Sequence, residues 1–426
     1  MIGRSESCSI TSALNGKDWD AVLQIVDPRE RRLVGAADAL LEAACAWRPG
    51  RTRPPCDQVR RILVLRLERI GDLMMSLPAI HALRRLAPHA EIDLVVGSWN
   101  AQLAALIRGI TRVDTLDARW LSRDAGGLGV AAMMRHARGW RGRSYDCAIN
   151  LEGDIRSNLV LAMSGARWCA GFGMAGGGPV LDVVAPFTAL AHTATNGVRL
   201  VYDALGEPLP PDVSLTGPGR DIAAALPADA LLLPADSRAH AGHLLGPAAG
   251  FRHVVGIQTG AGRLVKDWAA TRMAQIASRL VTRRGAAIVL TGAPDDRAAA
   301  DTIRAALPAS AVLIDLVGSL DLVALAAVLE RLSVFITPDT GPMHLAAAVG
   351  TPVAALFGPS SPDRWGPLSS RCRVVRVDLP CSPCNRIRRP PDRCVGHTPD
   401  CMDGITVDAV YEAAVALVDA ASGGRG

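Results

Sequence analysis

The sequence predicts an α/β fold with two successive domains that face each other across a cleft. From residue 61 onward, short runs of branched apolar residues alternate with helical stretches, which is typical of parallel sheets with helical crossovers. The alternation breaks down at 208–249, a stretch rich in Pro, Ala, Gly and Asp, and then restarts. A chain of 426 residues is also longer than one hydrophobic core usually organises.

The apolar runs and the helical periodicity place each element along the chain. We expect strands at 61–67, 92–96, 147–151, 254–257, 287–290, 312–315, 334–337 and 353–357. We expect helices at 73–86, 271–283, 296–307, 321–331, 343–349 and 407–420, with further helical patterning at 19–47. The predicted organisation is a helical extension (1–57), a first domain (58–215), a linker with edge elements (216–250), a second domain (251–405), and a C-terminal helix and tail (406–426).

The composition limits the partners of the protein. Lys and Arg number 46 against 41 Asp and Glu, a net charge of +5, which favours an anionic substrate or membrane surface. The charge is too diffuse to indicate nucleic acid. No apolar run reaches the ~18 residues that cross a bilayer, and the N-terminus has no apolar core of a secretory signal. We therefore expect a cytoplasmic protein with at most peripheral contact with the inner membrane.

The first motif follows the first expected strand, as the segment RLERIGD at 66–72. Gly71 permits a tight turn, and Asp72 then stands at the start of a helix, facing the cleft. Two roles are open for Asp72: a helix N-cap, or a general base that takes the proton of an acceptor hydroxyl. The G-x-G-x-x-G pattern is missing after this strand, which argues against an NAD-dependent oxidoreductase.

The second motif, QTGAG at 258–262, follows the strand that opens the second domain. Backbone N–H groups in such a glycine-bearing loop can hold phosphate oxygens. Lys266 comes shortly afterwards and is one of two lysines in a chain with 44 arginines, so its compact ammonium group is expected to matter for the same anion. The alternative is an ordinary solvated lysine.

The third motif, TPDTGPMH at 337–344, connects a buried strand to a helix. Thr340 and Gly341 offer N–H groups at a helix N-terminus, which is a ready anion site. His344 falls on the same helix face. Because Asp339 would repel a diphosphate, we expect it to contact hydroxyl groups of a donor sugar. The alternatives are a helix cap for Asp339 and a buried, satisfied histidine for His344.

The fourth motif is a group of four cysteines: Cys381, Cys384, Cys394 and Cys401. Four thiols that open with C-x-x-C suit a structural zinc or iron site, but the later spacings are not those of a standard zinc finger. Four thiols without a metal remain an equal alternative. No side chain that could act as a general base is paired with these cysteines in the sequence, so a catalytic role is not expected.

Together these motifs resemble glycosyltransferase family 9, the heptosyltransferase family, over roughly residues 60–415. The matching segments are 66–72 with Pro78, 91–96, 145–154, 260–268, 339–344, 356–360, 366–367 and the cysteine segment 381–402. The resemblance implies a GT-B fold, in which two Rossmann-like domains face a central cleft. It implies that the first domain binds the acceptor and the second a nucleotide-diphosphate sugar, with inversion at the anomeric carbon. It also implies that catalysis requires no metal or other cofactor.

The resemblance assigns roles to individual residues. Asp72 takes the position of the catalytic base. The donor-binding positions are Thr259, Gly260, Gly262, Lys266, Leu320, Asp339, Thr340, Gly341 and His344, with Leu320 near the base or ribose. The acceptor-binding candidates are Gly71, Asp154, Arg156 and His192. One departure is the pair at 261–262, where lipopolysaccharide-core enzymes tend to carry hydroxyl residues.

The expected activity is transfer of heptose from ADP-heptose to lipopolysaccharide core or a related surface glycan. Transfer to a protein or small-molecule acceptor is the alternative within the family. A catalytically inactive nucleotide-sugar-binding module, assembled through its N-terminal helices, is an alternative of another class, and Asp72 and Lys266 argue against it. Self-association into a homo-oligomer remains open.

Overall fold

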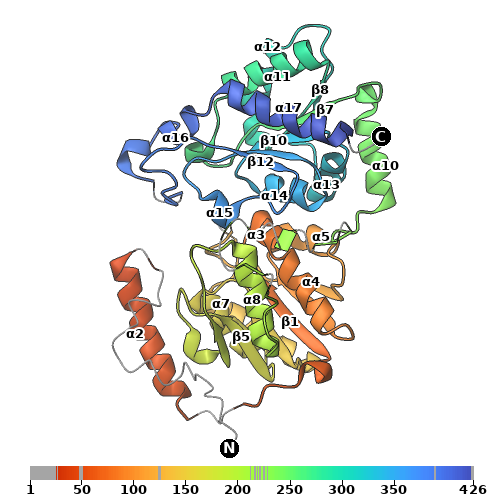
Figure 1. Ribbon diagram of the computed structural model, residues 1–426. Helices are drawn as coiled ribbons and strands as arrows, with labels where there is room; N and C mark the ends of the chain where they lie inside the picture. The colour runs from red at the N-terminus through yellow and green to blue at the C-terminus, as the bar shows by residue number, and fades with distance from the viewer. Residues whose placement is uncertain are drawn as a thin grey trace, which may run out of the picture.

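The computed structural model contains two α/β domains stacked end to end (Figure 1). It describes residues 25, 27–47, 51–122, 126–211, 213–214, 217, 219, 222–223, 226–227, 229–387 and 390–423. Each domain is built on a six-stranded sheet whose strand pairs all run parallel. The predicted fold class is confirmed.

The first sheet has the strand order β3-β2-β1-β4-β5-β6. Its strands are β1 (Arg61–Arg66), β2 (Glu91–Val96), β3 (Arg112–Thr115), β4 (Cys147–Asn150), β5 (Trp168–Phe172) and β6 (Val183–Ala185). Its helices are α3 (Ile70–Met75), α4 (Leu77–Leu86), α5 (Ala101–Ala104), α6 (Val130–Arg138), α7 (Ile155–Met163) and α8 (Thr193–Leu205). The order reverses between β1 and β4, and ligands bind in the crevice at such a switch point.

The second sheet repeats this topology in the order β12-β11-β10-β7-β8-β9. Its strands are β7 (Val254–Gln258), β8 (Ala287–Thr291), β9 (Leu313–Asp315), β10 (Val334–Pro338), β11 (Val353–Leu356) and β12 (Cys372–Val375). Its helices are α11 (Ala270–Arg284), α12 (Arg297–Ala306), α13 (Leu322–Glu330), α14 (Gly341–Ala348), α15 (Pro362–Trp365), α16 (Asp400–Asp403) and α17 (Val407–Gly423). The switch point lies between β7 and β10.

Several elements differ from the sequence predictions. Strands β3, β5, β6 and β12 were not expected. The single helix expected at 73–86 is two helices that meet at Ser76; Pro78, which lacks an N–H group, lies in the first turn of the second. The segment 216–250 contains a helix, α10 (Ala235–Leu244), which packs against α13.

The N-terminal helix α2 (Pro28–Cys45) is the described part of the helical pattern expected at 19–47, whose first residues lie outside the described ranges. It packs beside Gly178–Val180 of the first domain. Asp38, which is buried on this helix, accepts a hydrogen bond of 2.6 Å from the backbone N–H of Gly177. Burial raises the pKa of Asp38. This contact ties the extension to the first domain.

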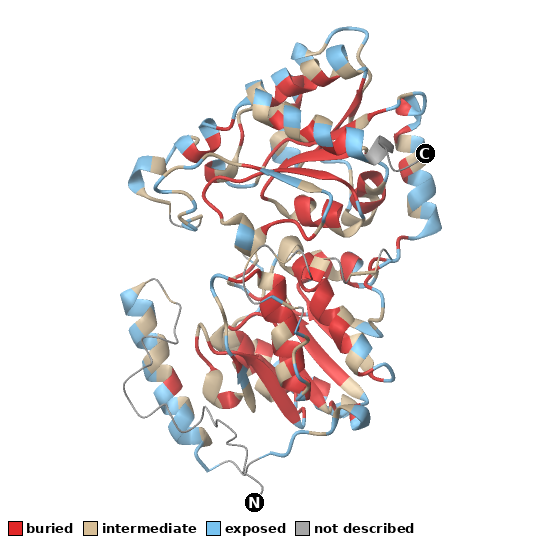
Figure 2. Ribbon diagram, viewed as in Figure 1, coloured by how far each residue is buried: buried red, intermediate tan, exposed pale blue. Residues whose placement is uncertain are grey.

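The two domains share an apolar core as well as a boundary. One cluster of buried apolar residues contains members of both sheets, and Figure 2 shows buried residues in the strands and where the domains meet. At that boundary α3 packs on α14. In the described part of the chain, no helix combines the length and the apolar character needed to span a bilayer.

Candidate active site

All three predicted ligand-binding motifs lie at the switch points of the two sheets. Asp72 follows β1, the loop that ends at Lys266 follows β7, and Asp339 follows β10. Because the carboxyl ends of adjacent parallel strands lie at one edge of a sheet, each switch point gathers its motifs in one crevice. The contact between α3 and α14 brings the two crevices together.

Asp72 lies in the first turn of α3, and its two carboxylate oxygens have different partners. Oδ2 accepts a hydrogen bond of 3.1 Å from the backbone N–H of Arg69, which is the N-cap residue of the helix. Oδ1 lies 3.6 Å from Nη2 of Arg66, and 27% of the side chain is exposed. The N-cap assignment for Asp72 is therefore wrong. One oxygen supports the start of the helix, while the side chain still reaches solvent.

Lys266 and Asp339 form an ion pair in the second domain. Lys266 Nζ lies 3.0 Å from Asp339 Oδ2. The hydroxyl of Ser360 donates to the same oxygen at 2.5 Å, so Asp339 holds the lysine in place. The alternative of a solvated surface lysine does not fit, because only 15% of the Lys266 side chain is exposed.

His344 connects the two crevices. The imidazole is buried, and burial lowers its pKa; the charges of Asp339 and Asp72 oppose this effect, while Lys266 adds to it. A Cβ atom on Gly71 would lie 2.9 Å from His344 Cδ2, so the first domain touches this ring directly. The charges of Asp72 in the first domain and of the Lys266–Asp339 pair in the second therefore both act on the imidazole of His344. These groups thus lie near each other at the domain boundary.

The loop after β7 is shaped by carboxylates and hydroxyls. A Cβ atom on Gly260 would lie 2.0 Å from Asp296 Oδ1, so no larger residue fits there without a shift. Gly262 has a φ of +66°, the left-handed region that favours glycine. The Thr259 hydroxyl donates to the carbonyl of Thr291 at 3.0 Å. These contacts fix the backbone that would face a phosphate.

The N-terminus of α14 lies next to this loop. Thr340 is the N-cap residue and Gly341 begins the helix. The hydroxyls of Thr340 and Thr337 are 3.1 Å apart. A Cβ atom on Gly341 would lie 3.0 Å from the side chain of Ile70 in the other domain. The positive end of this helix dipole thus points into the domain boundary.

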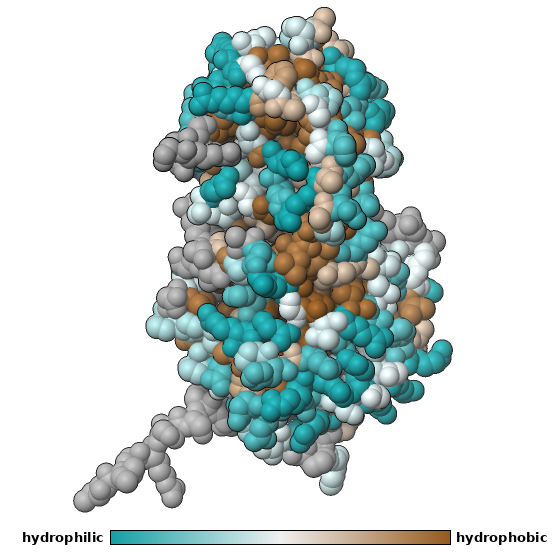
Figure 3. Space-filling model, turned by 90° about the vertical axis from the view of Figure 1, so that its right-hand side faces the viewer, coloured by the Kyte–Doolittle hydropathy of each residue, from teal (hydrophilic) through white to brown (hydrophobic). Residues whose placement is uncertain are grey.

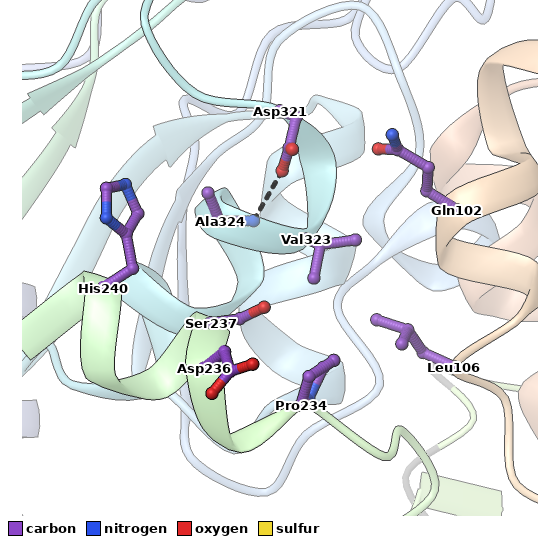
Figure 4. Close-up of a pocket in the computed structure, with 9 residues that line it drawn as sticks. All are labelled: Gln102, Leu106, Pro234, Asp236, Ser237, His240, Asp321, Val323 and Ala324. Atoms are coloured by element: carbon purple, nitrogen blue, oxygen red, sulfur yellow. Dashed lines mark hydrogen bonds between the residues drawn. The ribbon is translucent and has the colours of Figure 1, made fainter.

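Leu320 directly precedes Asp321, which lines a pocket at the domain junction on the α10 side (Figure 4). Residues of α5, α10 and α13 surround this pocket, among them Gln102, His240 and Asp321. Asp321 follows Leu320 and caps α13 by accepting a 2.7 Å hydrogen bond from the N–H of Ala324. Figure 3, which views the molecule from this side, shows apolar surface at mid-height. Neither Asp72 nor Lys266 lines the pocket, so the candidate chemistry lies elsewhere.

Two of the acceptor-binding candidates form a pair. Asp154 caps α7 through the N–H of Arg156 at 2.7 Å and also accepts from its Nε at 2.9 Å. The Arg156 guanidinium lies 4.2 Å from the centre of the Trp120 ring. A flat aromatic face beside charged groups is a surface on which a sugar could stack. This pair follows β4, on the same switch point as Asp72.

His192 does not face an open cleft. It is fully buried, with Nδ1 accepting from the N–H of Ala194 at 3.1 Å, so that Nε2 donates to the carbonyl of Gly366 at 3.0 Å. Burial lowers the pKa of His192 to about 4. The expectation of an acceptor contact is corrected: Nε2 bonds to the second domain, and Nδ1 bonds within the first domain.

Four polar residues that support the site were not predicted from the sequence: Arg66, Glu152, Asp296 and Ser360. Arg66 and Glu152 are buried at the ends of β1 and β4. Charged residues that directly follow apolar strand runs could have identified both. Asp296 lies against Gly260 in the loop after β7, and Ser360 bonds to Asp339 of the ion pair. Nothing in the local sequence indicates these contacts.

The four cysteines lie close enough for their thiols to interact. Burial raises the pKa of Cys401 to about 11, and Cys384, Cys381 and Cys394 add to the rise. Across the part of the chain that the structure describes, no three or more His, Cys, Asp or Glu side chains are placed to hold a metal ion. The structural zinc or iron site therefore stays a prediction. In the same segment, the Ser382 hydroxyl donates to the carbonyl of Gly358 at 2.7 Å, which braces a loop of the second domain.

Two facing doubly wound domains are the arrangement of the GT-B fold. The model of the family described as glycosyltransferase family 9 (heptosyltransferase) matches residues 133–393. The chain therefore belongs to glycosyltransferase family 9.

Curated relatives agree with this assignment, and solved structures agree with the fold. The chain is 27% identical over 334 residues to lipopolysaccharide heptosyltransferase 2 of Salmonella typhimurium, which covers 74% of this chain and 88% of the relative. It is 26% identical over 330 residues to lipopolysaccharide heptosyltransferase 1 of Pseudomonas aeruginosa, with 76% and 86% covered. The structure of the E. coli ADP-heptose lps heptosyltransferase II superposes with a TM-score of 0.68 at 23% identity, covering 85% of this chain and 99% of that one. A family 9 structure from Veillonella parvula gives a TM-score of 0.70 at 22% identity, with 86% and 99% covered.

Proposed function

We propose that the protein transfers heptose from ADP-heptose to a hydroxyl group of lipopolysaccharide core or a related surface glycan. Family membership supports a sugar transfer, and the lipopolysaccharide heptosyltransferases among its relatives support this donor and acceptor. In this proposal the first domain binds the acceptor and the second binds the nucleotide sugar. No cofactor takes part.

The observation that carries the proposal is the meeting of opposite charges at the domain boundary. Asp72 comes from the first domain, and the Lys266–Asp339 pair and the start of α14 come from the second. His344 is influenced by all three charged side chains. A carboxylate from one domain, with a lysine and helix N–H groups from the other, suits the removal of a proton on one side and the departure of a diphosphate on the other.

In the proposed reaction the acceptor oxygen forms a bond to the anomeric carbon of the donor. The bond from that carbon to the diphosphate oxygen breaks on the opposite face, which inverts the configuration. Asp72 takes the proton of the acceptor hydroxyl. Lys266 and the backbone N–H groups at Thr340 and Gly341 stabilise the charge that develops on the diphosphate, a task that a divalent metal performs in other transferases.

The remaining candidates position the two substrates. The loop that would hold the diphosphate is shaped by Thr259, Gly260 and Gly262. Leu320 would contact the base or the ribose of the donor nucleotide. Asp339 holds Lys266 and remains within reach of donor hydroxyls. On the acceptor side, Gly71 allows the close approach beside Asp72. Asp154 and Arg156, with the ring of Trp120, would contact the acceptor sugar.

The test combines donor choice with one substitution. Purified protein is incubated with ADP-heptose, or with other nucleotide sugars, and a lipopolysaccharide-core acceptor, and nucleotide release is measured. We expect turnover with ADP-heptose and its loss by at least about 10²-fold in Asp72→Asn, because general base catalysis contributes roughly this much. Donor binding should persist in this variant. Turnover that persists in the presence of EDTA would support the metal-independent mechanism.

The matched control is Asp146→Asn. Asp146 accepts backbone hydrogen bonds from Arg60 and Arg61 at the opposite end of β1, so its replacement should leave turnover unchanged. Full activity of Asp72→Asn would overturn the base assignment. Turnover with a UDP-sugar but not with ADP-heptose would overturn the donor, and transfer only to a protein or small molecule would overturn the acceptor.

A further inference from the structure

Arg66 is buried at the end of β1 and contacts Asp72 in two places. Only 4% of its side chain is exposed. Its Nε donates to the backbone carbonyl of Asp72 at 3.2 Å, and its Nη2 lies 3.6 Å from Asp72 Oδ1. One guanidinium thus touches both the main chain and the carboxylate of the proposed base.

The same guanidinium also binds the neighbouring strand and loop. Nη1 donates to the carbonyl of Leu151 at 2.6 Å, directly after β4, and lies 3.0 Å from Glu68 Oε2. The rigid planar fork of arginine can hold several acceptors in a fixed geometry, which lysine cannot do. The position of Asp72 is therefore tied to the two strands that form the switch point.

A third carboxyl group near this arginine, that of Glu152, is buried. Glu152 accepts a hydrogen bond from the backbone N–H of Leu67, and its charge interacts with that of Arg66. Arg66 thus stands among three carboxyl groups: Asp72, Glu68 and Glu152. Without its positive charge, these groups would repel each other and the loop that carries Asp72 would lose its fixed shape.

We propose that Arg66 is the positioning residue of the base: it fixes the Asp72 carboxylate toward the acceptor hydroxyl and balances the charge of the carboxyl groups around it. This inference rests on the proposed function of Asp72. A misplacement of about 1 Å of a reacting group can lower a rate about 10²-fold. In the described part of the chain, the side chain of Arg66 contacts Asp72, Leu151 and Glu68, none of which is a donor-binding candidate, so its loss should affect turnover and leave donor binding intact.

The experiment compares Arg66→Gln and Arg66→Lys with the unmodified enzyme. The kcat values are expressed per ADP-binding site, so that unfolded protein does not count. We expect Arg66→Gln to lower kcat by about 10²-fold while the donor KM stays within about threefold. Arg66→Lys keeps the positive charge but loses the planar guanidinium group, so its kcat should be about tenfold higher than that of Arg66→Gln.

The matched control is Arg84→Gln. Arg84 also bonds backbone carbonyls of neighbouring loops, those of Pro88, Ala90 and Gly109. It lies at the opposite end of the sheet, at the end of α4. Its replacement should lower the unfolding temperature and leave kcat per binding site unchanged.

The outcomes separate this inference from the proposed function. An inactive Asp72→Asn together with a kcat of Arg66→Gln equal to that of the Arg84→Gln control would overturn the role of Arg66 alone. A rise in donor KM without loss of kcat would do the same. Full activity of Asp72→Asn would overturn both. Loss of kcat in Arg66→Gln with partial recovery in Arg66→Lys is the result that supports it.

Discussion

The buried carboxyl of Glu152 is expected to make the stability of the protein depend on pH, and Glu152→Gln is expected to remove this dependence. Burial raises the pKa of Glu152 from 4.5 to about 7; the charge of Arg66 and the hydrogen bond from Leu67 oppose the rise, while Asp154 and Asp72 add to it. Glutamine has nearly the same shape and keeps an oxygen that can accept the hydrogen bond from Leu67.

The sign and size follow from proton linkage. Because the pKa is raised in the folded state, the unfolded chain ionises first as the pH increases. The contribution of Glu152 to stability is thus complete below pH 4.5 and is lost progressively up to about pH 7. At 1.36 kcal/mol for each pH unit, this interval corresponds to about 3 kcal/mol. Glu152→Gln should gain about this amount relative to the unmodified protein between pH 4.5 and pH 8.

The assay is urea unfolding of both proteins at several pH values between 4.5 and 8, with the folded fraction measured by circular dichroism. Glu91→Gln is the control, since the Glu91 side chain is 46% exposed and its substitution should change stability by less than about 1 kcal/mol. Stability curves of Glu152→Gln and the unmodified protein that run parallel over this range would refute the reasoning.

The free energy of unfolding of Glu152→Gln has to be compared with that of the unmodified protein, because His192 changes stability with pH in the opposite direction to Glu152. Burial lowers its pKa from 6.5 to about 4, so the unfolded chain takes up this proton first as the pH falls. Its contribution to stability is present above pH 6.5 and is lost toward pH 4. In the unmodified protein the effects of Glu152 and His192 partly cancel, so its pH profile alone would conceal both.

Three further substitutions probe the contacts at the domain boundary and the donor loop. Gly71→Ala places a Cβ 2.9 Å from His344 Cδ2, so the domain contact must shift and kcat should fall at least about tenfold in the nucleotide-release assay. Gly260→Ala places a Cβ 2.0 Å from Asp296 Oδ1, so the loop must move and the donor Kd, measured by calorimetry with ADP, should rise about tenfold. His192→Phe removes both ring hydrogen bonds and should lower the unfolding free energy by about 2 kcal/mol at pH 8, with a smaller loss near pH 4.

Gly139→Ala is the matched control for both glycine substitutions, because a Cβ there would meet nothing within 4 Å. Unchanged kcat in Gly71→Ala, or unchanged ADP affinity in Gly260→Ala, would contradict the close contacts. For His192→Phe, a loss of stability that is the same at pH 8 and pH 4 would contradict the neutral, doubly bonded imidazole.

The strands that the sequence predicted are those rich in branched apolar residues. Strands β3 and β12 were missed because they lie at sheet edges and are largely exposed, so they carry no apolar run. The missed strand β5 is buried, but it contains Cys169 and Gly171 in place of branched residues. Gly171 has the side chains of Asn158 and Leu181 3.1 Å from a Cβ position, so this strand is adapted to its neighbours rather than to strand propensity.

The site motifs were predictable because each joins the end of a strand to the start of a helix, and the switch point of a doubly wound sheet then gathers them. The partnerships within the site were not predictable. Arg66 meets the carbonyl of Leu151 only because β1 pairs with β4 in the register Leu65↔Asn150. In the same way, the Lys266–Asp339 pair depends on the pairing of β7 with β10.

The contact between Gly71 and His344 makes the geometry of the site depend on how the domains pack. His344 belongs to the second domain, yet it touches the residue that directly precedes Asp72. A shift of one domain relative to the other would therefore also move the Asp72 carboxylate relative to Lys266. Burial lowers the pKa of His344, so its ring is neutral at neutral pH and packs against the first domain without forming an ion pair with Asp72.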